Sequence, residues 1–177
     1  MKENLKTPIH KGDHVIGNPK ASIDLVEYGD YECPYCGAAY PIIKKIQADL
    51  KSDLKFVFRN FPLIEIHPHA LHAAMAAEAA ALQGKFWEMH DLLFENQQFL
   101  TPKDLVKYAQ KLNLDMKAFE TAMESKHIKG RIDKDFDSGI RSGVNGTPTF
   151  YINGEKYNGY TEEASLLQAL KPQIQLH

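Results

Sequence analysis

The two cysteines of this 177-residue chain, Cys33 and Cys36, are the feature that most constrains its fold and its chemistry. Only Pro34 and Tyr35 separate them. Because proline favours the first position of a helix, we expect Cys33 at a helix N-terminus and Cys36 one turn further along the same face. The two sulfurs can then form a small, easily reduced Cys33–Cys36 disulfide, and the helix dipole stabilises a thiolate on Cys33. The motif predicts redox chemistry.

Zinc binding and an inert structural disulfide are the alternatives for these cysteines. A structural zinc site needs four ligands, and the sequence has no second cysteine pair or Cys/His pair at finger spacing. His67, His69 and His72 form a cluster, but Pro68 interrupts the local geometry and histidines near a helix start often lie at the surface. We therefore expect no metal site.

The segments on both sides of the cysteines predict a βαβ unit. Residues 23–28 are apolar and β-prone and end at a glycine, which is typical of a buried strand. Apolar residues at helical spacing follow from residue 34 to about residue 51, with Pro41 expected to kink that helix. Residues 54–59 give a second strand. Strand, helix and strand at this spacing indicate a parallel, right-handed unit.

The rest of the chain is helical until strand character returns near its end. Helical patterns fill residues 63–143, including a capping signal at Thr101 and an N-cap at Asp115. A hairpin with an Asn153-Gly154 turn and a terminal helix follow. We expect an α/β fold with the following organisation: a lead-in over residues 1–20, a sheet domain over 21–62 and 144–177, and an inserted helical subdomain over 63–143.

Taken together, these features resemble the DsbA-like members of the thioredoxin superfamily. The resemblance rests on the Cys-Pro-Tyr-Cys motif after a strand, on Pro41, on the helical insertion, and on the segment Gly-Val-Asn-Gly-Thr-Pro-Thr-Phe at residues 143–150. It covers most of the chain. It implies a thioredoxin-like fold, with a central mixed β-sheet flanked by helices. It also implies a protein disulfide oxidoreductase that uses a redox-active CXXC motif and needs no cofactor.

The resemblance also implies which residues bind the substrate. The Thr147–Pro148 peptide bond is implied to be cis and to lie beside the active cysteines. A proline there leaves the Thr147 backbone free to pair with an extended substrate. We place Pro34 and Tyr35 on the same substrate-binding surface.

Glu27, six residues before Cys33, matches the position where these folds bury an acid behind the resolving cysteine. Burial would raise the pKa of its carboxyl group, which would let Glu27 exchange a proton with Cys36. With Cys33 and Cys36 it completes the expected catalytic set.

Tyr35 departs from the best-known oxidising members, which have Pro-His between the cysteines. A tyrosine cannot supply an imidazolium to the Cys33 thiolate. We therefore expect a thiol pKa below that of free cysteine but less depressed than theirs, and a less oxidising reduction potential. The direction of electron flow stays open.

Composition and charge narrow the partners. A net charge of −2 with 25% charged residues does not favour nucleic acid or an anionic membrane surface. We expect protein or peptide thiols and disulfides as substrates, and an unidentified redox partner that recycles the motif. No apolar run is long enough for a membrane span, and the first residues lack the apolar core of a signal peptide. We expect a cytoplasmic protein as written, or an extracytoplasmic one if the chain is a processed form.

Two other functions remain open from the residues alone. One is a glutathione-dependent transferase or isomerase on the same kind of fold, which would tolerate loss of Cys36. The other is a non-enzymatic chaperone or metal-binding module that uses the helical insert, whose activity would survive loss of both cysteines.

Overall fold

A five-stranded mixed sheet lies at the centre of the structure, a computed structural model that describes residues 4–172. Its spatial order is β1-β3-β2-β4-β5. β2 and β3 are parallel, and the other neighbouring strands are antiparallel. The strands are β1 (His14–Gly17), β2 (Ile23–Gly29), β3 (Leu54–Asn60), β4 (Thr149–Ile152) and β5 (Glu155–Lys156). The predicted thioredoxin-like α/β architecture is confirmed.

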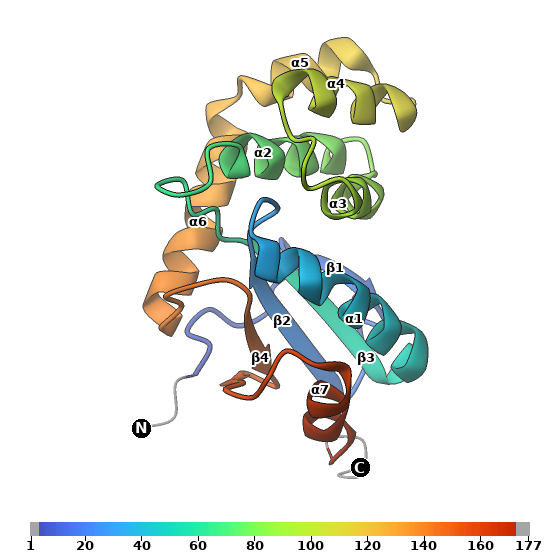
Figure 1. Cartoon of the computed structure of the whole chain (residues 1–177), viewed down its shortest axis with the longest axis vertical. Coiled ribbons are helices and arrows are strands. Elements are labelled where there is room, and N and C mark those ends of the chain that lie inside the picture. The colour runs from blue at the N-terminus through green and yellow to red at the C-terminus, as the bar shows by residue number, and fades with distance from the viewer. Residues whose placement is uncertain (1–3, 173–177) are drawn as a thin grey trace.

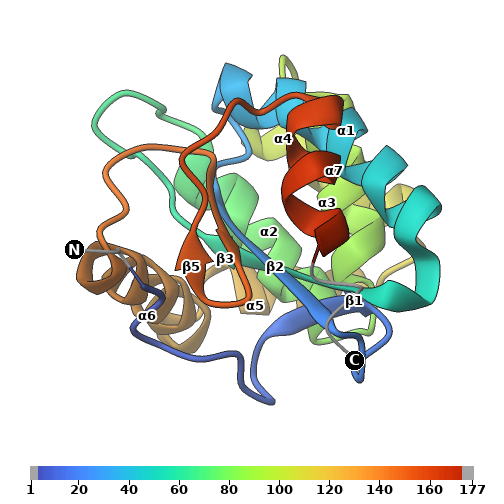
Figure 2. The ribbon, with the colours of Figure 1, turned by 90° about the horizontal axis from the view of Figure 1, so that it is seen from below.

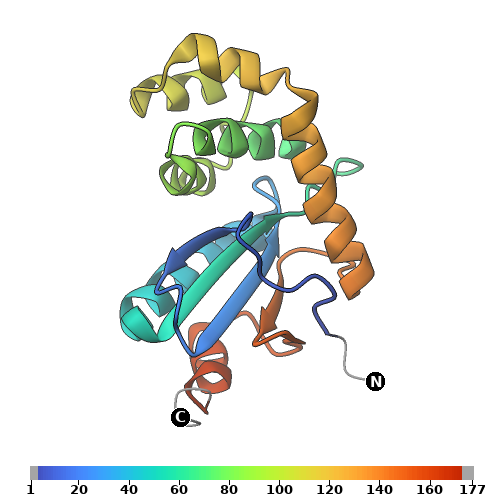
Figure 3. The same ribbon diagram turned by 180° about the vertical axis from the view of Figure 1, so that it is seen from behind.

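Helices cover both faces of this sheet and form a second layer at one end (Figure 1). Figure 2 shows α1 and α7 on one side of the sheet and α6 on the other. The helices α2 to α5 gather beyond the end of the sheet, and α6 runs from this group back alongside it (Figure 3). The helices are α1 (Pro34–Leu50), α2 (Ala70–Ala81), α3 (Phe86–Glu95), α4 (Pro102–Lys111), α5 (Met116–Met123), α6 (Lys126–Ser142) and α7 (Glu163–Leu170), with a short 3₁₀ turn, η1 (Lys51–Asp53).

Local sequence signals explain several of these boundaries. Thr101 and Asp104 form the capping box predicted for α4, and the Asp115 side chain accepts a hydrogen bond from the Ala118 N–H at 2.9 Å to begin α5. Asn153 and Gly154 both have positive φ, at 47° and 83°. The β4–β5 hairpin therefore has the predicted type I′ turn.

The N-terminal lead-in contributes a strand and one partner of a buried ion pair, neither of which the sequence predicts. β1 pairs with β3 at the edge of the sheet. Arg59 of β3, only 1% exposed, forms an ion pair with Asp13 at 2.9 Å. It also donates hydrogen bonds to the Thr7 and Pro8 carbonyls and to the Tyr28 hydroxyl, at 2.9, 3.1 and 2.9 Å. The sequence did not reveal this arrangement because its members lie far apart along the chain.

One hydrophobic core continues from the sheet into the helical insert. Phe58 of β3 and Tyr31, in the loop before α1, contact aromatic side chains of α3. α6 also contacts β3. The division of the chain at residues 63 and 143 stays a prediction, since no clear break in packing marks it. Among the helices of residues 4–172, none combines the length and the apolar character needed to cross a membrane.

Candidate active site

The two cysteines lie at the start of α1, as their spacing predicts. Cys33 is the N-cap residue, with φ −68° and ψ 122°, and Pro34 is the first helical residue. Cys36 lies one turn further on and is fully buried, while Cys33 is 3% exposed. Both are free thiols in this structure, which is the reduced form of the pair. The Cys33–Cys36 disulfide stays a prediction.

The surroundings of Cys33 favour its thiolate. The pKa of Cys33 is lowered to about 5, chiefly by a hydrogen bond from the Cys36 thiol, and burial opposes this shift. The Thr147 hydroxyl and the backbone N–H groups of Cys36 and Tyr35 lower the pKa further. Cys33 is therefore ionised at neutral pH.

The surroundings of Cys36 have the opposite effect. Burial raises the pKa of Cys36 well above the ordinary value, and the hydrogen bond to Cys33 and the charge of Glu27 add to this shift. The backbone N–H of Asp30, 3.5 Å from the Cys36 sulfur, opposes it only weakly. One cysteine is therefore a thiolate and its neighbour a thiol at the same pH.

Glu27 lies in the middle of β2 with 4% of its surface exposed. Its register partners on the two flanking strands are Phe58 and Phe150. Burial, followed by the negative charge of Cys33, raises the pKa of Glu27 to about 8. Glu27 is thus buried close to the cysteines, and its part in proton transfer stays a prediction.

The Thr147–Pro148 peptide bond is cis and lies beside the cysteines, as the resemblance implied. The Thr147 carbonyl oxygen is 3.4 Å from the Cys33 sulfur. Tyr35 is 75% exposed next to it. The structure therefore brings together Pro34, Tyr35, Thr147 and Pro148 around Cys33, but it does not test whether they bind a substrate.

Asp30 lies next to the motif, in the loop between β2 and α1, and it is buried there rather than part of a solvated loop. It is 1% exposed, and its carboxylate accepts hydrogen bonds from the Glu32 N–H, the Leu63 N–H and the His67 ring, at 2.8, 2.9 and 2.7 Å. Glu32 in turn accepts a hydrogen bond from the His69 N–H. These bonds join the cysteine loop to the segment before α2.

The histidine cluster does not form a metal site in the described part of the chain. His67 pairs with Asp30, as above, and residues 4–172 contain no group of three or more His, Cys, Asp or Glu side chains placed to hold a metal ion.

The helical insert also holds the cysteine loop in place. The Gln97 side-chain amide, in the loop after α3, donates hydrogen bonds to the carbonyls of Tyr31 and Cys33, at 2.8 and 2.9 Å. The Tyr31 hydroxyl lies 3.0 Å from Nδ1 of His90 on α3. Burial lowers the pKa of His90 to about 3, so its ring is neutral. These partners are far apart in sequence, and no local pattern indicates them.

The geometry agrees with comparisons to known proteins. The sequence profile of the thioredoxin family matches residues 10–172. The chain belongs to the thioredoxin family. The crystal structure of oxidised BdbD from Bacillus subtilis superposes with a TM-score of 0.86 and 26% identity, covering 99% of this chain and 100% of that one. The crystal structure of a variant of alpha-DsbA1 from Wolbachia pipientis superposes with a TM-score of 0.82 and 25% sequence identity. The match covers 96% of this chain and 94% of that one. This thioredoxin-family chain is therefore DsbA-like.

Curated relatives of this DsbA-like chain include a much longer membrane protein. The Na(+)/H(+) antiporter NhaA 3 from Salinispora tropica is 48% identical over 153 residues, which are 86% of this chain but 23% of the relative. The chain thus spans about a quarter of the length of such relatives. The expectation of a cytoplasmic protein is wrong, because it rested on the absence of apolar segments, and relatives with the same domain are membrane antiporters.

Proposed function

We propose that this chain is a thiol–disulfide oxidoreductase that exchanges disulfides with protein or peptide substrates through Cys33 and Cys36. The observation that carries the proposal is the opposite shift of the two thiol pKa values at one helix start. A thiolate is the nucleophile in thiol–disulfide exchange, so a low pKa at the more accessible sulfur favours attack from there. A neutral, buried Cys36 suits the resolving role.

The reaction then proceeds in two exchange steps. The Cys33 thiolate attacks one sulfur of a substrate disulfide, and the other substrate sulfur leaves as a thiolate, so Cys33 is joined to the substrate. Cys36 next loses its proton to the Glu27 carboxylate and attacks the Cys33 sulfur. This forms the Cys33–Cys36 disulfide and releases the second substrate thiolate. The substrate gains two electrons and the motif loses two, and the reverse sequence oxidises a dithiol.

The residues around Cys33 supply a surface for the substrate chain. The Thr147 backbone beside the Cys33 sulfur can pair with an extended peptide in the manner of an added strand. Pro34, Tyr35 and Pro148 complete this surface, and the exposed Tyr35 ring offers apolar contact. A second thiol–disulfide protein must return the motif to its starting state, since each turnover leaves the motif changed by two electrons.

Insulin reduction by dithiothreitol, followed by turbidity, tests the proposal. We expect the protein to accelerate it and Cys33→Ser to abolish the acceleration. We expect Cys36→Ser to accumulate a mixed disulfide that appears as added mass on a non-reducing gel. Equal activity of Cys33→Ser and the unmodified protein would remove the proposal. Full turnover by Cys36→Ser with glutathione would instead favour a glutathione-dependent transferase or isomerase.

The reduction potential of the pair determines the preferred direction. We expect a value between about −270 mV, as in thioredoxin, and about −120 mV, as in DsbA. Equilibration with glutathione buffers of known ratio, with the two forms separated after thiol alkylation, measures it.

A further inference from the structure

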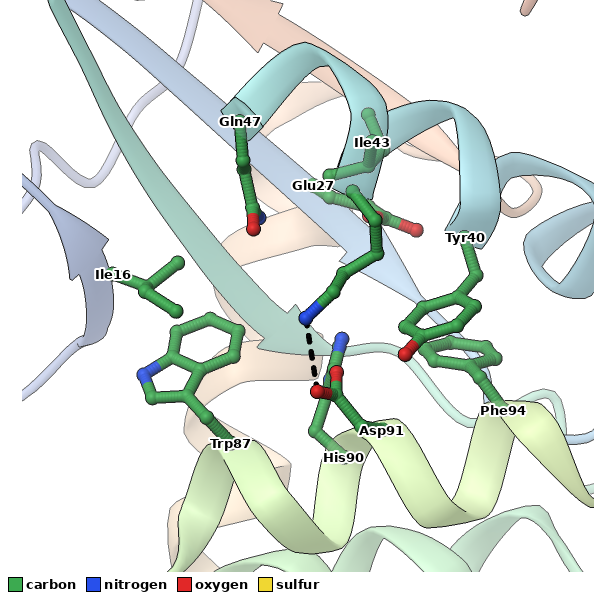
Figure 4. Close-up of a pocket in the computed structure, with 10 residues that line it drawn as sticks. Ile16, Glu27, Tyr40, Ile43, Gln47, Trp87, His90, Asp91 and Phe94 are labelled. Carbon is green, nitrogen blue, oxygen red and sulfur yellow. Dashed lines mark hydrogen bonds and ion pairs between the residues drawn. The ribbon is translucent and has the colours of Figure 1, made fainter. Parts of the chain in front are cut away.

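A small cavity lies against Glu27, between α1 and α3 (Figure 4). Its volume is about 10 Å³, close to what one ordered water molecule needs. Tyr40, Ile43 and Gln47 line it from α1, and Trp87, His90, Asp91 and Phe94 line it from α3, with Ile16 and Lys44 completing the wall. In Figure 4 the labelled side chains of the two helices converge on this space.

The cavity adjoins the protein surface on its outer side. A larger open groove, about 390 Å³, lies over the C-terminal half of α1 and the edge strand β1. Ile16, Lys44 and Gln47 line both the groove and the cavity. At this boundary Lys44 Nζ and Asp91 Oδ2 are 2.9 Å apart, and their side chains are 41% and 30% exposed. The ion pair therefore bridges α1 and α3 at the outer end of the cavity.

Glu27 needs a route to water if it takes part in proton exchange. Phenylalanines flank it on both neighbouring strands, and within residues 4–172 no protein group hydrogen bonds to its carboxyl group. Cys33 and Cys36 interact with it electrostatically. The cavity lies against Glu27, and Lys44, Gln47 and Asp91 bring polar groups into a wall that is otherwise mostly apolar. A water molecule held there can carry a proton to or from the carboxyl group.

We infer that the cavity between α1 and α3 is the path by which Glu27 exchanges its proton with solvent, and that the Lys44–Asp91 ion pair closes its outer end. The inference rests on the proposed function, because only a turnover that protonates and deprotonates Cys36 requires such a path. Lys44 and Asp91 are positioning residues here: they control access of water and do not touch the reacting sulfurs.

Several ionisable groups surround Glu27, and each bears on its titration. Cys33 and Cys36 of α1 and Tyr31 of the preceding loop interact with it electrostatically. Tyr40 and Lys44 of α1 and His90 and Asp91 of α3 line the cavity with it. Its register partners on β3 and β4 carry no charge. Lys44 is the cation among these groups, so its removal distinguishes water access from simple charge effects.

Titration of Glu27 in Lys44→Ala tests the closing role of the ion pair. Loss of a nearby positive charge, on its own, raises the pKa of a carboxyl group. Loss of the closing side chain admits water, which reduces the burial cost and lowers that pKa. We expect the pKa of Glu27 to fall by about one unit in Lys44→Ala. Carbon-13 NMR of labelled glutamate in the reduced protein measures this pKa, and the Glu27→Gln variant assigns the signal. A rise or no change would overturn the closing role.

Two further variants control this measurement. Asp91→Ala removes the other partner, and we expect a fall in the Glu27 pKa again. Lys45→Ala removes the same charge one residue along α1, where Lys45 pairs with Glu163 of α7 at 2.8 Å. We expect no shift in that variant. A fall in Lys45→Ala as large as in Lys44→Ala would contradict the inference.

The rate of resolution tests the cavity as the path itself. Ile16 lines both the cavity and the groove, so Ile16→Phe narrows their junction while Ile16→Val leaves it open. We expect stopped-flow resolution of a preformed Cys33 mixed disulfide to slow about tenfold in Ile16→Phe, with a larger solvent deuterium isotope effect. This is part of the roughly 10²- to 10⁴-fold that general acid–base catalysis contributes. Ile16→Val should keep the original rate.

Equal rates of mixed-disulfide resolution in folded Ile16→Phe and Ile16→Val would contradict the inference that the cavity is the proton path. Thermal unfolding of both variants establishes that each is folded. The Glu27 pKa can be measured even if the protein exchanges no disulfides. Failure of the inference therefore appears in the titration, whereas failure of the proposed function appears in the insulin assay.

Discussion

At the scale of single residues, Cys33 and Cys36 differ in charge because a hydrogen bond from Cys36 lowers the pKa of Cys33, while burial raises the pKa of Cys36. The Cys36 thiol is the largest cause of the low pKa of Cys33, at about 5. This value lies well below that of free cysteine, although Tyr35 supplies no imidazolium. Hydrogen bonds therefore stabilise the thiolate in this motif without help from a charged histidine.

We expect the rate of Cys33 alkylation by iodoacetamide to rise with pH and reach half its plateau near pH 5, because only the thiolate reacts. Cys36→Ala removes the largest favourable hydrogen bond and should shift this midpoint upward. Thr147→Val should shift it upward by less, and Thr147→Ser, which keeps a hydroxyl, should not. An unchanged midpoint in Cys36→Ala would show that the shift has another cause.

Glu27 should make the stability of the reduced protein depend on pH. Its folded pKa of about 8 lies above the ordinary value of 4.5, so the folded state binds the proton more tightly and loses stability as pH rises between these values. We expect Glu27→Gln to raise the free energy of unfolding by roughly 2 to 4 kcal/mol near pH 8, since one pKa unit corresponds to about 1.4 kcal/mol.

Urea unfolding across this pH range measures the effect of Glu27→Gln. The difference between the two proteins should vanish near pH 4, where the carboxyl group is protonated in both states. A constant difference at all pH values would mean that the variant changes packing and not ionisation.

At the scale of elements, the loop after α3 packs closely against α1 at Gly37. The three atoms nearest to a Cβ atom at this position would all belong to the Gln97 side chain, which donates hydrogen bonds to the carbonyls of Tyr31 and Cys33. Elsewhere in a helix, alanine is more stable than glycine by about 1 kcal/mol. The close approach of the insert therefore requires glycine here.

We expect Gly37→Ala to destabilise the otherwise unchanged protein by about 1 to 2 kcal/mol, since it displaces a side chain that makes two hydrogen bonds. In a Gln97→Ala background the same substitution should stabilise by up to about 1 kcal/mol, because the obstacle is gone and only helix propensity remains. Denaturant unfolding of the four proteins measures both effects. The same sign in both backgrounds would contradict this account.

At the scale of the whole molecule, the buried Arg59–Asp13 pair ties the N-terminal segment to the sheet. Hydrogen bonding and the charge of Arg59 hold the pKa of Asp13 below its ordinary value although burial opposes this. We expect Asp13→Ala to cost about 3 to 5 kcal/mol in unfolding free energy, because Arg59 stays buried without its carboxylate. Arg59→Met with Asp13→Leu should recover part of the loss. A loss of unfolding free energy in Asp13→Ala no larger than that for an exposed ion pair would contradict the role of the Arg59–Asp13 pair in holding the N-terminal segment.

The sequence by itself determined the local chemistry and most elements of this protein. The Cys-Pro-Tyr-Cys spacing predicts the start of α1, and the Asn153-Gly154 pair predicts the β4–β5 hairpin. Thr101 and Asp115 are the N-cap residues of α4 and α5, as predicted. These features could be predicted because each depends only on residues that are neighbours in the chain. Glu27 and the Thr147–Pro148 bond were predicted through resemblance to a family.

Tertiary structure alone decided which distant residues hold the site. The Gln97 bonds to the cysteine loop, the His67–Asp30 pair, the Arg59–Asp13 pair and the cavity behind Glu27 join residues from separate elements. Their side chains give no periodic signal, because hydrogen bonds and ion pairs depend on positions in space that folding sets. The strand β1 was missed for the same reason: four residues at a sheet edge become a strand only by pairing with β3.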